Sequence, residues 1–216
     1  IYITTRFPEG DCRMWWYELE KLCGSHNSIV FTIKGKSYNF KMQNQIQRNR
    51  CFRKIHNLLQ SLPENEQNDL MSLIRQGRSP ENYKKYCLTW EDIQQLDREP
   101  LITIGAHTHS HTNMKKLTTE DLRKEILTSN LLFEEKLGHT IDHFAYPYGT
   151  SNEAGIREYS IVGASGYKTA VTNMCDSLKS DSQVFCLPRY SVLERDNPFK
   201  LDIKLSGWNA FWKYQL

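Results

Sequence analysis

Predicted strands and helices alternate through the second half of this sequence, and the alternation limits its fold more than any other feature. The predicted strands cover residues 101–104, 141–146, 167–172 and 187–192. The longest helix between them is predicted to begin after Thr118, in a capping box, and to end at Gly138. Strands that alternate with helices indicate an α/β fold with a mostly parallel sheet, whose functional groups gather at the carboxyl ends of the strands.

The first half has a different pattern. Residues 29–40 form a predicted hairpin around Lys34-Gly35-Lys36. Residues 43–80 are rich in polar and basic side chains, and apolar residues recur at helical spacing on both sides of Pro63. We therefore predict a helical insertion at 43–80 inside a single domain that spans 1–216.

Three histidines follow the predicted strand 101–104 within five positions. Imidazoles clustered at the end of a strand are typical of a metal site. If His107 and His111 share a helical turn, their i, i+4 spacing places both on one face, and His109 points elsewhere. The alternative is a polar surface loop.

Composition and charge argue against several classes of partner. The formal net charge is +3, and no run of Lys and Arg indicates a nucleic-acid partner. No apolar stretch approaches the roughly 20 residues of a membrane-spanning helix. The six cysteines include no Cys-x-x-Cys pair, so we expect reduced, partly buried thiols rather than a structural zinc site. A bridge between Cys175 and Cys186 is the alternative.

Two motifs, each after a predicted strand, match a known family in order and spacing. The first is Ile-Gly-Ala-His107-Thr-His-Ser-His111-Thr-Asn, and the second is Phe144-Ala-Tyr-Pro-Tyr-Gly149. They resemble the His-Ser/Thr-x-x-His motif and the substrate-groove motif of the polysaccharide deacetylases (carbohydrate esterase family 4, the chitooligosaccharide deacetylase-like domain). Leu187-Pro-Arg189 resembles a later strand in one branch of that family. Residues 1–5 are similar to the strand that follows the family's first motif.

The resemblance implies a distorted (β/α) barrel, here lacking its first strand, that removes acetyl groups from a polysaccharide. It also implies a divalent metal ion, most often zinc, held by an Asp-His-His triad in which His107 and His111 match the two histidines. The backbone N–H of Tyr148 matches the donor that stabilises the oxyanion in the family. The expected partner is an acetylated polysaccharide or oligosaccharide, and N-acetyl groups are the expected target.

The chain departs from the family at three places. The family's first motif carries adjacent aspartates as the base and the third metal ligand, and no Asp-Asp pair occurs in these 216 residues. Many members carry an arginine where this chain has Ala145, and Arg189 is a candidate to supply that charge from another strand. No histidine follows His143, so no general acid is assigned. We therefore expect further chain to precede Ile1, and we expect the 216 residues alone to be inactive.

Two other functions fit parts of the pattern. A deacetylase-like fold that has lost catalysis would only bind carbohydrate. An upstream sequence with an Asp-Asp pair would argue for the enzyme, and an upstream sequence without one would argue for this alternative. A metal-dependent phosphoesterase also opens with a His-x-His motif, similar to His107-Thr-His109. That class needs more histidine and carboxylate ligands downstream than this sequence has. The glycan, the metal ion and the cellular compartment are not predicted.

Overall fold

The chain divides into two compact units. The computed structural model describes residues 1–192 and 196–206. One unit, here called the sheet unit, comprises Ile1–Thr5 and Trp90–Leu216. The other, here called the hairpin unit, comprises Arg6–Thr89.

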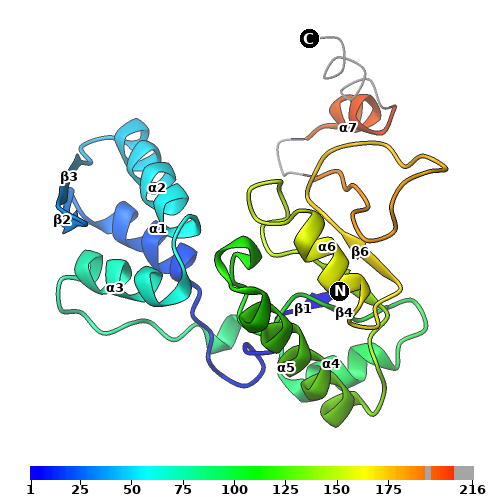
Figure 1. The fold of residues 1–216 in the computed structure, drawn as a ribbon. Coiled ribbons are helices and arrows are strands. Elements are labelled where there is room, and N and C mark those ends of the chain that lie inside the picture. Colours follow the sequence, from blue (N-terminus) through cyan, green and yellow to red (C-terminus); the bar gives the residue numbers. More distant parts are fainter. Residues whose placement is uncertain (193–195, 207–216) are drawn as a thin grey trace. The chain divides into compact units, whose positions relative to one another are not determined.

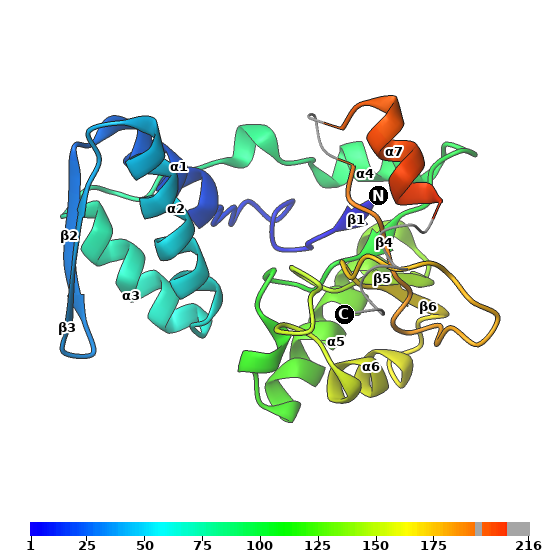
Figure 2. The same cartoon turned by 90° about the horizontal axis from the view of Figure 1, so that it is seen from above.

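A parallel sheet of four short strands forms the centre of the sheet unit (Figures 1 and 2). Its order is β1-β4-β5-β6. The strands are β1 Tyr2–Ile3, β4 Gly105–Ala106, β5 His143–Ala145 and β6 Thr169–Val171. Every neighbouring pair is parallel, with Ile3 opposite Ala106, Ala106 opposite Phe144 and Phe144 opposite Ala170. The predicted α/β class is confirmed, and within the described residues the sheet is open rather than closed into a barrel.

Helices pack on this sheet through one apolar core. They are α4 Trp90–Asp97, the 3₁₀ turn η2 Met114–Lys116, α5 Thr119–Leu137 and α6 Ile156–Gly163. The last helix of the unit, α7 Pro198–Leu205, has no buried residue and is not part of this core. Leu122, Ile126 and Phe133 of α5 are fully buried in the core beside Phe144 of β5. None of the helices in the described part of the chain is long and apolar enough to cross a membrane.

The predicted ends of α5 are confirmed. The Thr118 side chain accepts a hydrogen bond from the backbone N–H of Asp121 (3.1 Å), which satisfies one of the unpaired donors at the helix start. Gly138 ends the helix in the left-handed conformation, at φ 81°.

Two predicted strands are wrong in extent. Residues 101–104 are not a strand: Leu101 is 98% exposed, and pairing begins at Gly105. In the predicted strand 187–192, only Leu187 pairs, through an isolated parallel bridge to Val171. The sequence also predicts a helix in the tail 199–216 that carries Trp208, Phe211 and Trp212, and these three positions lie outside the described residues.

The hairpin unit has its own core. Its elements are α1 Trp15–Ser25, β2 Ser28–Ile33, β3 Lys36–Lys41, α2 Gln45–Gln60, α3 Glu64–Arg75 and the 3₁₀ turn η1 Lys84–Tyr86. The fully buried residues Leu19, Ile55, Leu59 and Leu70 join α1, α2 and α3. The predicted hairpin and the two helices on either side of Pro63 are confirmed. That 43–80 is an insertion in the family's domain stays a prediction, and the compact unit around it is larger.

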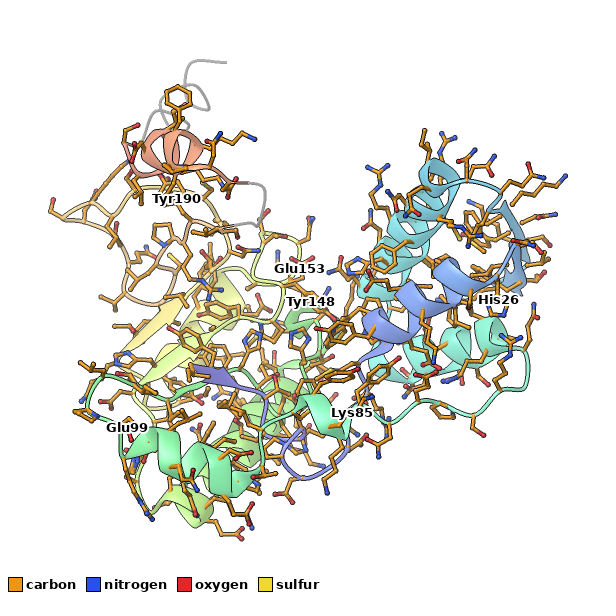
Figure 3. All side chains as sticks on the ribbon, turned by 180° about the vertical axis from the view of Figure 1, so that it is seen from behind. His26, Lys85, Glu99, Tyr148, Glu153 and Tyr190 are labelled. Carbon is orange, nitrogen blue, oxygen red and sulfur yellow. The ribbon has the colours of Figure 1, made fainter. Side chains whose placement is uncertain are left out.

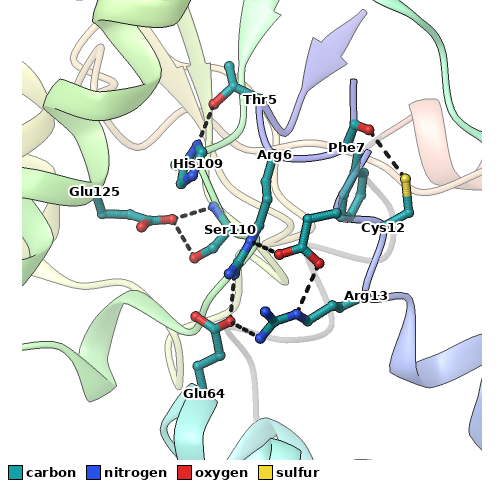
Figure 4. Close-up of polar contacts among 10 residues, drawn as sticks. Thr5, Arg6, Phe7, Cys12, Arg13, Glu64, His109, Ser110 and Glu125 are labelled. Carbon is teal, nitrogen blue, oxygen red and sulfur yellow. Dashed lines mark hydrogen bonds and ion pairs between the residues drawn. The ribbon is translucent and has the colours of Figure 1, made fainter. Parts of the chain in front are cut away.

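An ion-pair network fixes the start of the hairpin unit to α3. Arg6 donates to Asp11 (2.7 Å) and to Glu64 (2.5 Å), and Arg13 donates to the same two carboxylates at 3.0 and 3.3 Å (Figure 4). Glu64 is the first residue of α3, where a negative charge also favours the helix dipole.

Candidate functional site

The carboxyl ends of the parallel strands gather the candidate residues at one edge of the sheet. Thr4 follows β1, His107 follows β4, Tyr146 follows β5 and Thr172 follows β6. Because all four strands run in the same direction, these positions lie at the same end of the sheet. This is the edge where the sequence predicts the chemistry.

Two hydrogen bonds fix the position of His107. Its backbone N–H donates to the carbonyl of Ile3 (2.9 Å), which continues the pairing of β1 with β4. Its ring Nδ1 lies 2.7 Å from the carbonyl oxygen of Ala145 in β5. A carbonyl only accepts, so Nδ1 carries the proton and Nε2 keeps its lone pair. Histidines that bind metals in proteins are commonly held in this way, through the ring nitrogen that does not bind the ion.

His111 lies beside His107, although not on a helical turn. The two ring centroids are 4.9 Å apart and the rings are nearly perpendicular. Thr108 and His111 both have positive φ, at 63° and 58°, so the chain reverses between the histidines. The His111 backbone N–H donates to the Thr108 hydroxyl (3.0 Å) inside this loop. The two histidines that the motif pairs are thus in ring contact, through a loop with positive φ angles rather than through a helical turn.

Both imidazoles are neutral at neutral pH. Burial lowers the pKa of His107 to about 4 and the pKa of His111 to about 3. The positive charge of Arg189 adds to the lowering of the His107 pKa, and His107 adds to the lowering of the His111 pKa. A neutral imidazole with an available lone pair is the form that binds zinc and similar ions.

Threonines at the end of β1 support the histidine loop. The Thr4 hydroxyl donates to the carbonyl of His107 (3.1 Å), and the Thr5 backbone N–H donates to the carbonyl of Thr108 (3.2 Å). The Thr5 hydroxyl lies 3.0 Å from Nδ1 of His109 (Figure 4). His109 thus turns toward β1. No motif in the sequence marks these threonines, although polar residues directly after a parallel strand are a usable signal.

A carboxylate on α5 holds the middle of the same loop. One oxygen of Glu125 accepts from the backbone N–H of Ser110 (2.5 Å) and from its hydroxyl (2.7 Å) (Figure 4). Glu125 lies on a predicted helix with no motif around it, so only the folded structure reveals this contact.

Tyr148, which is labelled in Figure 3, lies in a tight turn after β5. Its ring centroid is 4.9 Å from that of His111. Tyr148 and Gly149 have positive φ, at 60° and 71°, and the Gly149 N–H donates to the Pro147 carbonyl (2.6 Å). The Gly149 carbonyl in turn accepts from the N–H of Asn173 (2.7 Å).

Arg189 reaches the same edge from the segment that follows the Leu187 bridge. Its Nε donates to the carbonyl of Thr172 (2.7 Å), and its guanidinium carbon is 5.7 Å from the centroid of the Tyr2 ring. Its positive charge contributes to the lowered pKa of His107, after burial of that imidazole. Tyr148 and Arg189 are thus brought to the predicted edge.

The donor set fits a divalent metal ion in part. Two neutral imidazoles in ring contact, one with its tautomer fixed by a carbonyl, are suitable ligands. Within the described residues, no group of three or more His, Cys, Asp or Glu side chains is arranged to hold an ion. Catalytic zinc sites normally use three protein ligands, so this edge supplies two.

Two further histidines, His139 and His143, contact residues outside the His107–His111 pair. Nδ1 of His143 lies 2.8 Å from the Thr169 hydroxyl across β5 and β6. His139 pairs with Asp97 (2.7 Å) at the surface. All six cysteines are free thiols.

Comparison with known families agrees with the motifs. The polysaccharide deacetylase model matches residues 53–167, which is more than half of the chain and includes His107, His111 and Tyr148. This chain belongs to the polysaccharide deacetylase family. No curated protein matches it.

Several solved structures of deacetylases are similar to the fold. A deacetylase from Streptococcus pyogenes, solved in complex with acetate, is 19% identical, with a TM-score of 0.49, and the match covers 63% of this chain and 54% of that one. A polysaccharide deacetylase from Bacillus cereus is 15% identical (TM-score 0.48, 55% and 37% covered). A deacetylase domain from Bordetella bronchiseptica is also 15% identical (TM-score 0.42, 49% of each chain). The match thus spans about half or less of each of these structures.

Proposed function

We propose that the protein hydrolyses acetyl groups, chiefly N-acetyl groups, on a polysaccharide or oligosaccharide. The observation that carries the proposal is the contact between His107 and His111 at the carboxyl edge of the sheet, inside the segment that matches the family. The two rings are neutral, and Ala145 leaves Nε2 of His107 available as a ligand atom.

In this proposal His107 and His111 hold a divalent ion, with zinc as the favoured one. The chemistry such an ion supplies when bound is polarisation of a carbonyl and activation of water at neutral pH. The contribution of the chain is to hold both imidazoles neutral and oriented, through Ala145 and through the threonines that follow β1.

Tyr148 and Arg189 have proposed supporting roles. The backbone N–H of Tyr148 is the proposed donor to the oxyanion of the tetrahedral intermediate, a role that contributes roughly 3–4 kcal/mol to transition-state stabilisation in hydrolases. The contact of the Tyr148 ring with His111 supports this role, because it keeps the turn beside the proposed ligands. Arg189 supplies positive charge near the same group, in place of the arginine that Ala145 replaces.

A second candidate is carbohydrate binding without catalysis. It is favoured by the donor set, since the described residues bring only two ligands together. The two candidates differ in one property: the enzyme needs a third ligand and a base, and the binding domain needs neither.

The test is acetate release from an N-acetylated chito-oligosaccharide, with added zinc or with a chelator. It compares the wild type, His107→Ala and the control His109→Ala. We expect zinc-dependent release by the wild type and by His109→Ala, and none by His107→Ala. Release that is unchanged by chelator and by His107→Ala would refute the metal mechanism. Glycan binding with no release in any sample would favour the second candidate.

A further inference from the structure

Two buried cysteines of the hairpin unit are in direct contact. Cys23 lies near the end of α1 and Cys51 lies in the first half of α2, and their Sγ atoms are 3.8 Å apart. Their exposed fractions are 3% and 1%. A disulfide bond has a sulfur–sulfur distance of about 2.05 Å, so the thiols need to approach by less than about 2 Å.

The backbone around the two cysteines is already fixed. Arg48, one turn before Cys51 on α2, donates to the carbonyls of Cys23 (2.5 Å), Gly24 (2.8 Å) and His26 (2.9 Å). These are carbonyls at the carboxyl end of α1 that lack a partner within the helix. The guanidinium of Arg48 therefore keeps the end of α1 in position next to Cys51.

We propose that Cys23 and Cys51 form a disulfide bond when the chain folds in the presence of a low-molecular-weight disulfide. One thiolate of the pair attacks one sulfur of that disulfide, which forms a mixed disulfide and releases one small thiol. The other thiolate then attacks the protein sulfur of the mixed disulfide and releases the second small thiol. Two protein S–H bonds are lost and one S–S bond forms, while the small disulfide is reduced to two thiols.

Cys23 is the thiol that ionises more easily. Its hydrogen bond with Cys51 and the nearby positive charge of Arg48 lower its pKa, while the same hydrogen bond and burial raise the pKa of Cys51. Because both side chains are buried, reagents reach them during folding rather than in the finished fold.

A second pair of thiols lies in the same unit, since burial and a hydrogen bond with Cys12 raise the pKa of the Cys87 thiol, and both also contact backbone carbonyls. The Cys12 thiol donates to the carbonyl of Phe7 (3.2 Å), and the Cys87 thiol donates to the carbonyl of Tyr83 (3.7 Å). Cys186 donates to the side chain of Gln183 (3.8 Å). Cys175 is exposed.

The experiment refolds the reduced full chain in a buffer of oxidised and reduced glutathione, then blocks free thiols and maps tryptic peptides without reduction. Each of the six cysteines falls in a different tryptic peptide, so the linkage is unambiguous. We expect the peptide of Cys23 joined to that of Cys51. Cys51→Ala and Cys23→Ala remove this linked peptide, and Cys175→Ser keeps it.

A thermal measurement supplies a second readout. We expect reduction to lower the Tm of the hairpin unit by roughly 10 °C in the wild type, and to leave the Tm of Cys51→Ala unchanged. The proposal is overturned if Cys23 and Cys51 are both alkylated after oxidative refolding, or if either is joined to a different cysteine.

Discussion

The carbonyl oxygen of Ala145 accepts a hydrogen bond from Nδ1 of His107 across 2.7 Å. This bond joins the ends of β4 and β5, and it determines which ring nitrogen of His107 is available to a ligand. Ala145, which stands where the resemblance places an arginine in many members, thus holds His107 through its backbone carbonyl. This contact does not depend on the side chain at position 145.

The tautomer of His107 follows from that bond. In long-range ¹H–¹⁵N NMR spectra of the metal-free protein, we expect His107 as the neutral form protonated at Nδ1, with the proton absent from Nε2. Added zinc is expected to shift the Nε2 resonance and to leave Nδ1 protonated. An Nε2-protonated ring, or a zinc-induced loss of the Nδ1 proton, would contradict the arrangement.

Replacing Gly149 is expected to disrupt the turn that carries Tyr148. Its φ is +71°, and an added Cβ would lie 2.7 Å from the backbone nitrogen of Asn173. Gly149→Ala should lower the free energy of unfolding by about 2–4 kcal/mol, from strain and from overlap together. Urea unfolding measures the loss.

The matched control is Gly138→Ala at the end of α5. Gly138 also has a positive φ, of +81°, but no atom lies within 4 Å of an added Cβ. Its loss should be about 1–2 kcal/mol, from strain alone. Equal losses for the two variants would show that overlap with Asn173 does not add to the destabilisation caused by a side chain at position 149.

Removing Glu125 should weaken metal binding without removing a ligand. Its carboxylate accepts two hydrogen bonds from Ser110, in the middle of the loop between His107 and His111. We expect Glu125→Ala to reduce zinc affinity roughly 10-fold, as measured by titration calorimetry. Glu135→Ala, at an exposed position of the same helix, should leave the affinity unchanged. If both variants bind zinc like the wild type, the loop does not depend on Glu125.

His139 is expected to titrate above its ordinary pKa. The hydrogen bond with Asp97 raises its pKa, and the backbone of Thr140 adds to the effect. A raised pKa in the folded state stabilises the fold at pH values below the unfolded pKa, and this contribution disappears as pH rises through the folded pKa. NMR titration should give a lower His139 pKa in Asp97→Asn than in the wild type. An unchanged His139 pKa in Asp97→Asn would show that a group other than Asp97 raises it.

Local signals predicted much of the fold. The capping residue Thr118 and the terminal Gly138 gave the correct ends of α5, because capping depends on neighbouring residues. The strand at 101–104 was wrong because apolar residues in a short run do not reveal their burial, and Leu101 is exposed. The structure brings the rings of His107 and His111 together, as the motif indicates, whereas the positive φ angles at Thr108 and His111 have no signal in the sequence.

The contacts that support the site depend on residues distant in sequence. Glu125 and Thr4 reach the histidine loop only after β1, β4 and α5 have come together. No periodicity or local motif contains this information. The same holds for the core of the hairpin unit, since α1 joins α2 and α3 through packing rather than through a sequence pattern.

The order of the two units along the chain has a consequence for the site. The chain leaves the sheet unit after Thr5 and returns at Trp90, so the paired strands β1 and β4 are separated in sequence by the whole hairpin unit. If that unit unfolds, a long flexible loop must be closed each time β1 meets β4, and the entropy cost grows with the loop. The hydrogen bond from the Thr4 hydroxyl to the His107 carbonyl would then form less often. Folding of a unit that contributes none of the described site residues therefore affects how often the site is assembled.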